Sequence, residues 1–320
     1  MVLTARNLTC YIYTRVVFFV VGSARSGTTL LRMMLNAHPK IALPPESRFI
    51  VELYDGSDDV NVADLLRRLE AHKRWRTWGL PIEKVATELE GLERAPYADV
   101  LEACYRAFAR TRNKSLYGDK TPRYVEHIDL IHHLWPRARF VHLVRDGREI
   151  ALSYADVPFG PKNVAKAARL WDRRVGRGMA AGRSLPQDQY LELRYERLLV
   201  DPEDCLNTLT EFLGIEFDPR MLEFNTLASG EVLDRARIYN PHLTEKIART
   251  RSWAEQMPIS QVEVFEVIAG ETLSALGYER RFPHPGIVAR FSAGLGLAGA
   301  PVGRLRGTRR TSLPLGDPPI

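Results

Sequence analysis

The chain has 320 residues, of which 45% are hydrophobic and 26% are charged, with a formal net charge of +6. This length and composition are those of a soluble globular protein with a substantial core. The basic balance does not indicate a nucleic-acid-binding protein, because residues 279–320 hold seven arginines against Glu279 and Asp317 and so carry most of the excess charge.

The cysteines and the N-terminal segment point to a cytoplasmic protein. Cys10, Cys104 and Cys205 are odd in number and widely separated, so they predict neither a disulfide framework nor a metal site. The apolar run at residues 16–21 is too short to span a membrane. Residues 1–15 lack the apolar core of a signal peptide and are expected to be an N-terminal extension.

The first predicted elements are a strand and a helix. Residues 16–21, VVFFVV, are short, β-branched and aromatic, which predicts a buried strand. An apolar stripe predicts a helix over residues 28–37. Residues 61–112 are expected to be helical, with breaks near 79–81 and 94–96.

Strands and helices alternate in the rest of the chain. Further strands are expected at residues 138–144 and 189–193, and helices over about 149–154, 164–181, 202–213 and 259–276. This order predicts an α/β protein with a three-layer P-loop-type fold, in which helices flank a central, mainly parallel sheet. The domain is expected to span residues 16–280, and residues 281–320 are expected to be a disordered basic tail.

The loop after the first predicted strand has the spacing of a phosphate-binding loop. It reads Gly22-Ser23-Ala24-Arg25-Ser26-Gly27-Thr28-Thr29, and its backbone N–H groups are expected to surround an anion at a helix N-terminus. Thr28 stands where a nucleoside triphosphatase has its lysine, and the cation of the loop is Arg25. Without that lysine the loop lacks the usual group for the β- and γ-phosphates and their magnesium. The loop therefore predicts a phosphate site, but not one for the end of ATP.

A second motif follows the strand at residues 138–144. Arg145 ends this strand, and Ser153 lies eight residues later, about two helical turns along. With the loop at 22–29, this pair resembles the sulfotransferase superfamily, whose donor is 3′-phosphoadenosine 5′-phosphosulfate (PAPS). The resemblance implies that the 3′-phosphate binds Arg145 and Ser153, and that the 5′-phosphosulfate binds Arg25, Ser26, Gly27, Thr28 and Thr29.

Further segments extend the resemblance over roughly residues 16–280, in the bacterial and tyrosylprotein branch. PPESR at 44–48 resembles the Glu-Thr-Arg segment of tyrosylprotein sulfotransferases, and YGDKTP at 117–122 resembles the family's strand with a central lysine. LRYERL at 193–198 resembles its R-Y-E-D-L segment, with an arginine in place of the aspartate. In that segment Tyr195 is either an adenine-side contact or a core residue. RTRSW at 249–253 resembles a basic loop over the 3′-phosphate, which implies that Arg249 and Arg251 help to hold it.

The resemblance also implies the catalytic groups. Pro122 stands where small-molecule sulfotransferases have a histidine base, whereas Glu46 matches the glutamate base of the tyrosylprotein branch. A carboxylate is a competent base if burial raises its pKa, but Arg48 would lower it, so the geometry decides. His38 and His127 are alternative bases.

Two further groups would stabilise the transferring group and its leaving phosphate. Lys120 is expected to act at the bridging oxygen, and Arg25 at the leaving phosphate. Sulfonate bears less charge than a terminal phosphate, so no metal is expected.

The predicted activity is in-line transfer of a sulfonate from PAPS to a hydroxyl acceptor, which could be a small molecule, a glycan, a lipid or a peptide. Residues 50–115 either shape the acceptor pocket or form core through Trp75, Trp78, Tyr97, Tyr105 and Phe108. The basic tail is either a solvated extension or a weak membrane contact. Two alternatives stay open: a P-loop small-molecule kinase, which predicts binding of Mg·ATP, and a non-catalytic nucleotide-binding protein, in which Glu46→Ala would affect only stability.

Overall fold

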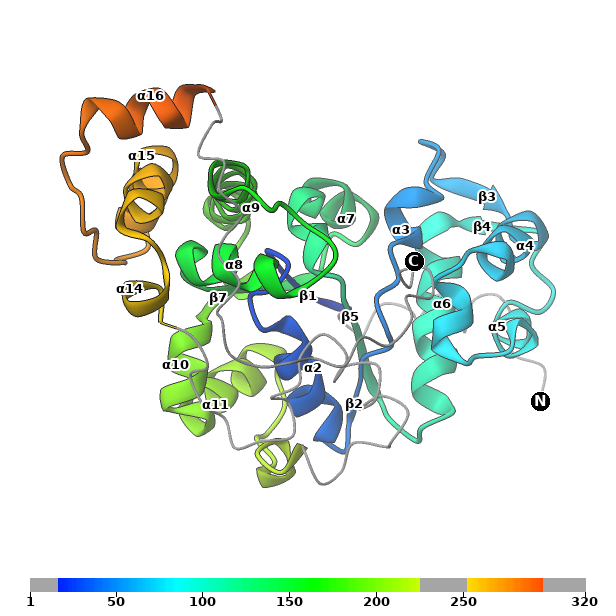
Figure 1. The fold of residues 1–320 in the computed structure, drawn as a ribbon. Helices are drawn as coiled ribbons and strands as arrows, with labels where there is room; N and C mark the ends of the chain where they lie inside the picture. Colours follow the sequence, from blue (N-terminus) through cyan, green and yellow to red (C-terminus); the bar gives the residue numbers. More distant parts are fainter. Residues whose placement is uncertain (1–16, 225–251, 296–320) are drawn as a thin grey trace, which may run out of the picture.

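The computed structural model describes residues 17–224 and 252–295. Five parallel strands form the central sheet in the order β2-β5-β1-β6-β7. They are β1 (Phe18–Gly22), β2 (Ile41–Ala42), β5 (Leu116–Lys120), β6 (Arg139–Val144) and β7 (Tyr190–Arg194). Parallel neighbours need crossover connections, which place helices on both faces of the sheet (Figure 1). The predicted α/β fold with a parallel sheet between helical layers is confirmed.

The apolar run at the start of the described chain is explained by burial on both faces of β1. Successive side chains of a strand point to opposite faces. Phe19 and Val21 therefore pack into one core cluster with Phe140, while Phe18 and Val20 pack into another with Leu31. A strand covered on both sides has no polar face, which is why its sequence does not alternate.

Helices from separate parts of the chain cover the two faces (Figure 1). One side carries α2 (Thr28–Ala37), α10 (Tyr195–Val200) and α11 (Pro202–Leu213). The other carries α7 (Ile128–Leu134), α8 (Gly147–Ser153) and α9 (Val164–Ser184). The bounds of α2 and α11 are those predicted, and α9 continues three residues beyond the predicted end at Ala181. Short 3-10 helices lie at Trp75–Trp78, Pro122–Glu126, Tyr154–Asp156, Gln187–Gln189 and Pro219–Met221.

The segment between β2 and β5 is largely helical, as predicted, but it also contains a small sheet. Its helices are α3 (Phe49–Glu52), α4 (Val62–Ala71), α5 (Ile82–Glu88) and α6 (Tyr97–Arg110). The predicted break near 94–96 is β4 (Arg94–Pro96), which pairs antiparallel with β3 (Asp59–Asn61). Three-residue strands are too short to show an alternating pattern. The five aromatic residues named for this region are all buried in the core: Trp75, Trp78, Tyr97, Tyr105 and Phe108.

Residues 252–295 form three helices at one end of the molecule (Figure 1). They are α14 (Trp253–Gln256), α15 (Ile259–Ala275) and α16 (Ile287–Leu295). Helix α15 packs on α9, and α16 packs on α15. Helix α16 lies inside the segment that was expected to be disordered, so the described part of that segment departs from the expectation. None of the helices in the two described ranges is both long and apolar enough to cross a membrane.

Two glycines of α9 allow a paired stability test. An added Cβ at Gly178 would lie 2.4 Å from Cε1 of the buried His142, whereas one at Gly176 would meet no atom within 4 Å. We expect Gly178→Ala to lower the free energy of unfolding by about 1–3 kcal/mol, because the His142 ring must shift inside the core. Gly176→Ala should instead raise it by about 0.5–1 kcal/mol, because alanine favours a helix over glycine. Urea unfolding of both variants checks the pair, and equal effects would contradict the close packing.

Candidate active site

The candidate residues meet at the carboxyl edge of the central sheet, where α/β proteins bind ligands. Gly22 ends β1, Lys120 ends the neighbouring β5, and Arg145 follows the end of β6 on the other side. The register pairs Val20 with Lys120 and Gly22 with Leu143, so these strand ends lie side by side. Three segments far apart in the sequence thus contribute to one site.

The loop at residues 22–29 has the backbone of an anion site. Gly27 adopts a left-handed conformation with φ of 96° and immediately precedes α2, so Thr28 and Thr29 form the first turn. The N–H groups of a first helical turn have no partner within their helix and can bind an anion. The Ser26 side chain is fully buried, and among the described residues its Oγ has no hydrogen-bond partner. A buried hydroxyl beside these N–H groups fits a phosphate oxygen.

Arg25 links the loop to α8. Its backbone is left-handed, with φ of 74°, which is unfavourable for a residue with a side chain. Its Nε donates to Ser153 Oγ at 2.9 Å, and its carbonyl oxygen accepts from Arg145 Nη1 at 3.3 Å. The structure therefore brings together the residues predicted for the 5′-phosphosulfate and for the 3′-phosphate.

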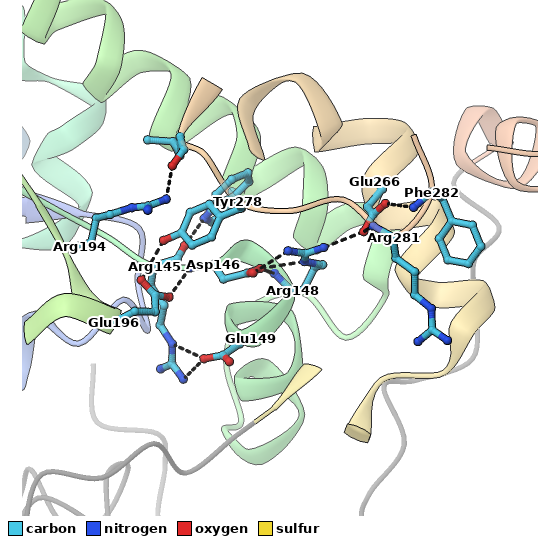
Figure 2. Close-up of polar contacts among 12 residues, drawn as sticks. Arg145, Asp146, Arg148, Glu149, Arg194, Glu196, Glu266, Tyr278, Arg281 and Phe282 are labelled. Carbon is cyan, nitrogen blue, oxygen red and sulfur yellow. Dashed lines mark hydrogen bonds and ion pairs between the residues drawn. The ribbon is translucent and has the colours of Figure 1, made fainter. Parts of the chain in front are cut away.

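Arg145 is a buried cation that already has a carboxylate partner. Its Nη2 and Nε donate to Glu149 Oε2 at 3.0 and 3.3 Å (Figure 2), and its guanidinium lies 4.4 Å from the centre of the Tyr195 ring. That ring also covers Gly27, where an added Cβ would lie 2.3 Å from Tyr195 Cδ2. Tyr195 thus packs against the phosphate loop. Glu149 was missed by the sequence analysis, because it lies on α8 whereas Arg145 precedes the helix, so helical spacing does not indicate the ion pair.

A second buried arginine holds α8 in place (Figure 2). Arg148 is 1% exposed; its Nε and Nη2 donate to the two carboxylate oxygens of Asp146 at 3.0 and 2.8 Å, and its Nη1 donates to Glu266 on α15 at 2.7 Å. Its guanidinium also lies 3.6 Å from the Trp253 ring centre. The helix that carries Ser153 is thereby fixed to the C-terminal helices.

Glu46, the predicted base, lies among cations. Its Oε1 accepts from Lys120 Nζ at 2.8 Å, and its Oε2 lies 3.9 Å from Arg48 Nη2. Burial alone would raise the pKa of Glu46, but Lys120, Arg74 and Arg48 together hold it below its ordinary value. The neighbouring cations therefore outweigh the effect of burial on the pKa of Glu46, and the group is a carboxylate in this structure. Arg74 was not a predicted site residue, since nothing in its local sequence relates it to Glu46.

Neighbours of this ion pair form a second connection between the same two segments. The Ser47 N–H donates to Thr121 Oγ1 at 3.1 Å, and Ser47 Oγ shares a hydrogen bond of 2.7 Å with Tyr124 OH. Behind them Tyr105 OH donates to Asp119 Oδ2 at 2.8 Å, and burial raises the pKa of Asp119 to about 6. These buried contacts fix the loop that carries the carboxylate against the end of β5.

The remaining predicted residues are two histidines and two arginines. His38 is buried, with Lys40 N donating to its Nδ1 and its Nε2 donating to the Glu216 carbonyl, each at 3.0 Å, so both ring nitrogens are engaged. His127 lies at the start of α7, where burial lowers its pKa. Arg249 and Arg251 fall outside the described residues. Within the described ranges, no three His, Cys, Asp or Glu residues gather as a metal site.

Solved structures share this fold. The sulfotransferase domain of the Synechococcus PCC 7002 olefin synthase superposes with a TM-score of 0.53 at 24% identity, covering 81% of this chain and 94% of that domain. The sulfotransferase domain from the curacin biosynthetic pathway also gives a TM-score of 0.53, at 18% identity, over 83% of this chain and 99% of that domain.

Comparisons of the sequence with known proteins point to the same family as these structures. Nodulation protein NoeE of Sinorhizobium fredii is 28% identical over 86% of this chain and 70% of its own length. Protein-tyrosine sulfotransferase 1 of Danio rerio is 26% identical over 88% of this chain and 77% of its own length. The family model described as "Sulfotransferase family" matches residues 18–219, which is more than half of the chain. With the phosphate loop, Arg145 and Ser153 in one place, the chain belongs to the sulfotransferase family.

Proposed function

We propose that this enzyme transfers a sulfonate from PAPS to a hydroxyl group, with Glu46 as the base and Lys120 at the transferring group. The observation that carries the proposal is the Lys120–Glu46 pair, with 2.8 Å between Nζ and Oε1, at the strand end beside the phosphate loop. It sets a cation and a carboxylate together where the donor would present its sulfonate. Family membership disfavours the two alternatives, a kinase and a non-catalytic protein.

The donor would lie along the loop and α8. The N–H groups of Thr28 and Thr29 and the Ser26 hydroxyl would bind the 5′-phosphosulfate. The 3′-phosphate would bind Arg145 and Ser153, which Arg25 already joins. Arg145 would then be shared between Glu149 and the phosphate, which requires a charge-assisted contact strong enough to compete with a buried carboxylate.

Proton transfer follows from a change of partner at Lys120. When the donor binds, the Lys120 ammonium would turn from Glu46 to the oxygen that bridges sulfur and phosphorus. Glu46 then loses the cation that contributes most to lowering its pKa and becomes a stronger base. The carboxylate takes the acceptor's proton as the acceptor oxygen bonds to sulfur, and the bond from sulfur to the bridging oxygen breaks. The products are a sulfate ester and 3′,5′-ADP, whose new phosphate charge Lys120 and the loop stabilise.

The acceptor is proposed only as a hydroxyl compound. Several relatives are named protein-tyrosine sulfotransferases, enzymes that act on a tyrosyl hydroxyl, while NoeE is named a nodulation protein. A panel of labelled-donor reactions with phenols, sugars, lipids and tyrosyl peptides would identify the class for this chain.

Donor binding can be tested without knowing the acceptor. We expect 3′,5′-ADP without metal to raise the melting temperature, with about 2.7 kcal/mol of stabilisation at about 100 times its Kd. Arg145→Ala should lose this shift, measured against its own melting temperature. Arg220→Ala, which removes an exposed arginine paired with Asp218, should keep it. A larger shift with Mg·ATP than with 3′,5′-ADP would refute the donor assignment.

Glu46 is tested by separating turnover from binding. Glu46→Gln should lower kcat by about 10²–10⁴ because an amide cannot accept the proton, while the stabilisation by 3′,5′-ADP is retained. Glu90→Gln, at an exposed position in a turn, is the matched control and should leave kcat unchanged. A Glu46→Gln enzyme with wild-type kcat would rule out the base role.

If Lys120 changes partner when the donor binds, the pH profiles of kcat/KM and of kcat should fall on the acid side at two different pH values. Activity falls as pH drops through the pKa of Glu46, because only the carboxylate accepts a proton. The limb of kcat/KM for the donor, which reports the free enzyme, should lie below the ordinary range of a glutamate, since Lys120 lowers that pKa. The limb of kcat should lie at higher pH, and Lys120→Met should move the kcat/KM limb upward. Coincident limbs in the wild type would contradict the switch of Lys120.

A further inference from the structure

Helix α16 exposes an apolar face at the edge of the molecule. Ile287, Val288 and Phe291 are 85%, 80% and 68% exposed, whereas Ala289 and Ala293 on the opposite side are buried. The buried side packs on α15, and Figure 1 shows α16 as the outermost helix at that end. Single exposed apolar residues are ordinary on a protein surface, but three large ones on a nine-residue helix form a patch.

The helix is attached to the domain and is not a loose end. The Arg169 guanidinium of α9 donates to the Ala293 carbonyl oxygen, and Gly286 N, just before the helix, donates to Glu263 Oε1 at 2.7 Å. Further back, the N–H groups of Arg281 and Phe282 donate to Glu266 at 3.0 and 2.7 Å (Figure 2). Glu263 and Glu266 are therefore engaged by the chain that leads into α16, and the apolar face has a fixed position.

The segment that contains and follows α16 is rich in arginine. Residues 280–320 contain seven arginines and a single acidic residue, Asp317. Arg281 lies before α16 and Arg290 lies on it, and both are exposed; four more arginines follow in the sequence at positions 304, 306, 309 and 310. An apolar helix face bordered by arginines matches the interface of a bilayer with anionic headgroups, where the apolar side chains enter the acyl boundary and the cations remain at the phosphates.

We propose that α16, with the arginines that flank and follow it, docks this enzyme on the surface of an anionic lipid bilayer. Ile287, Val288 and Phe291 would insert at the headgroup boundary, and the arginines would bind lipid phosphates. The proposal concerns a surface remote from the catalytic edge of the sheet, so it does not depend on the donor assignment.

Co-sedimentation of the full chain with vesicles tests the proposal. The wild type should bind vesicles of phosphatidylcholine mixed with phosphatidylglycerol, bind pure phosphatidylcholine much less, and lose binding as salt is raised. The double variant Ile287→Ser/Phe291→Ser should bind the anionic vesicles about tenfold more weakly because it loses apolar insertion. Val200→Ser, at an 86% exposed apolar position on α10, is the matched control and should bind like the wild type.

A second variant tests the proposal without changing α16, so that a loss of binding cannot come from misfolding of that helix. Replacing the arginines at 304, 306, 309 and 310 by glutamine changes only residues beyond the helix, and it should also weaken binding to anionic vesicles about tenfold. Absence of wild-type binding, equal binding to neutral vesicles, or unchanged binding by both variants would overturn the proposal. So would a concentration-dependent dimer that the double variant abolishes, because the face would then pair with a second copy.

Discussion

The buried guanidinium of Arg148 is the charge on which the position of α8, and so of Ser153, depends. At 1% exposure it is tolerable only because two carboxylates and an indole ring surround it. These partners come from the turn before α8, from α15 and from α14, so one cation fixes three parts of the chain. Removing one partner of such a pair typically costs about 3–5 kcal/mol, because the other charge stays buried. Because Ser153 is the last residue of α8, its position is fixed by these contacts of Arg148.

The Lys120–Glu46 pair is held differently, by a short strand end and a loop. Lys120 is the last residue of β5 and Thr121 follows it. Lys120 binds Glu46 and Thr121 binds Ser47, and these two partners are neighbours on the facing loop. The Lys120–Glu46 and Thr121–Ser47 contacts together fix both the distance between the loop and the end of β5 and their relative orientation. A single ion pair would leave the orientation free. In the proposed mechanism the charged contact would open when the donor binds, while the neutral one would keep the carboxylate in position.

The sequence predicted what depends on local patterns and missed what depends on long-range contacts. Helix α2 and the glycines around its loop follow from apolar spacing and backbone chemistry, and they lie where predicted. The pKa of Glu46 depends on Lys120, 74 positions away in the chain, and on Arg74, which no motif connects to it. The contact of Arg25 with Ser153 spans 128 positions, so the resemblance could name both residues but not their hydrogen bond.

The ion pair between Arg145 and Glu149 also affects the expected rate of product release. If Arg145 holds the 3′-phosphate, then the Glu149 carboxylate, four residues along the chain, is a tethered competitor present at the high effective concentration of an intramolecular group. It opposes the retention of 3′,5′-ADP as well as the binding of fresh donor. Because product release limits the turnover of many enzymes, a carboxylate that weakens binding at equilibrium would shorten the residence time of the spent nucleotide.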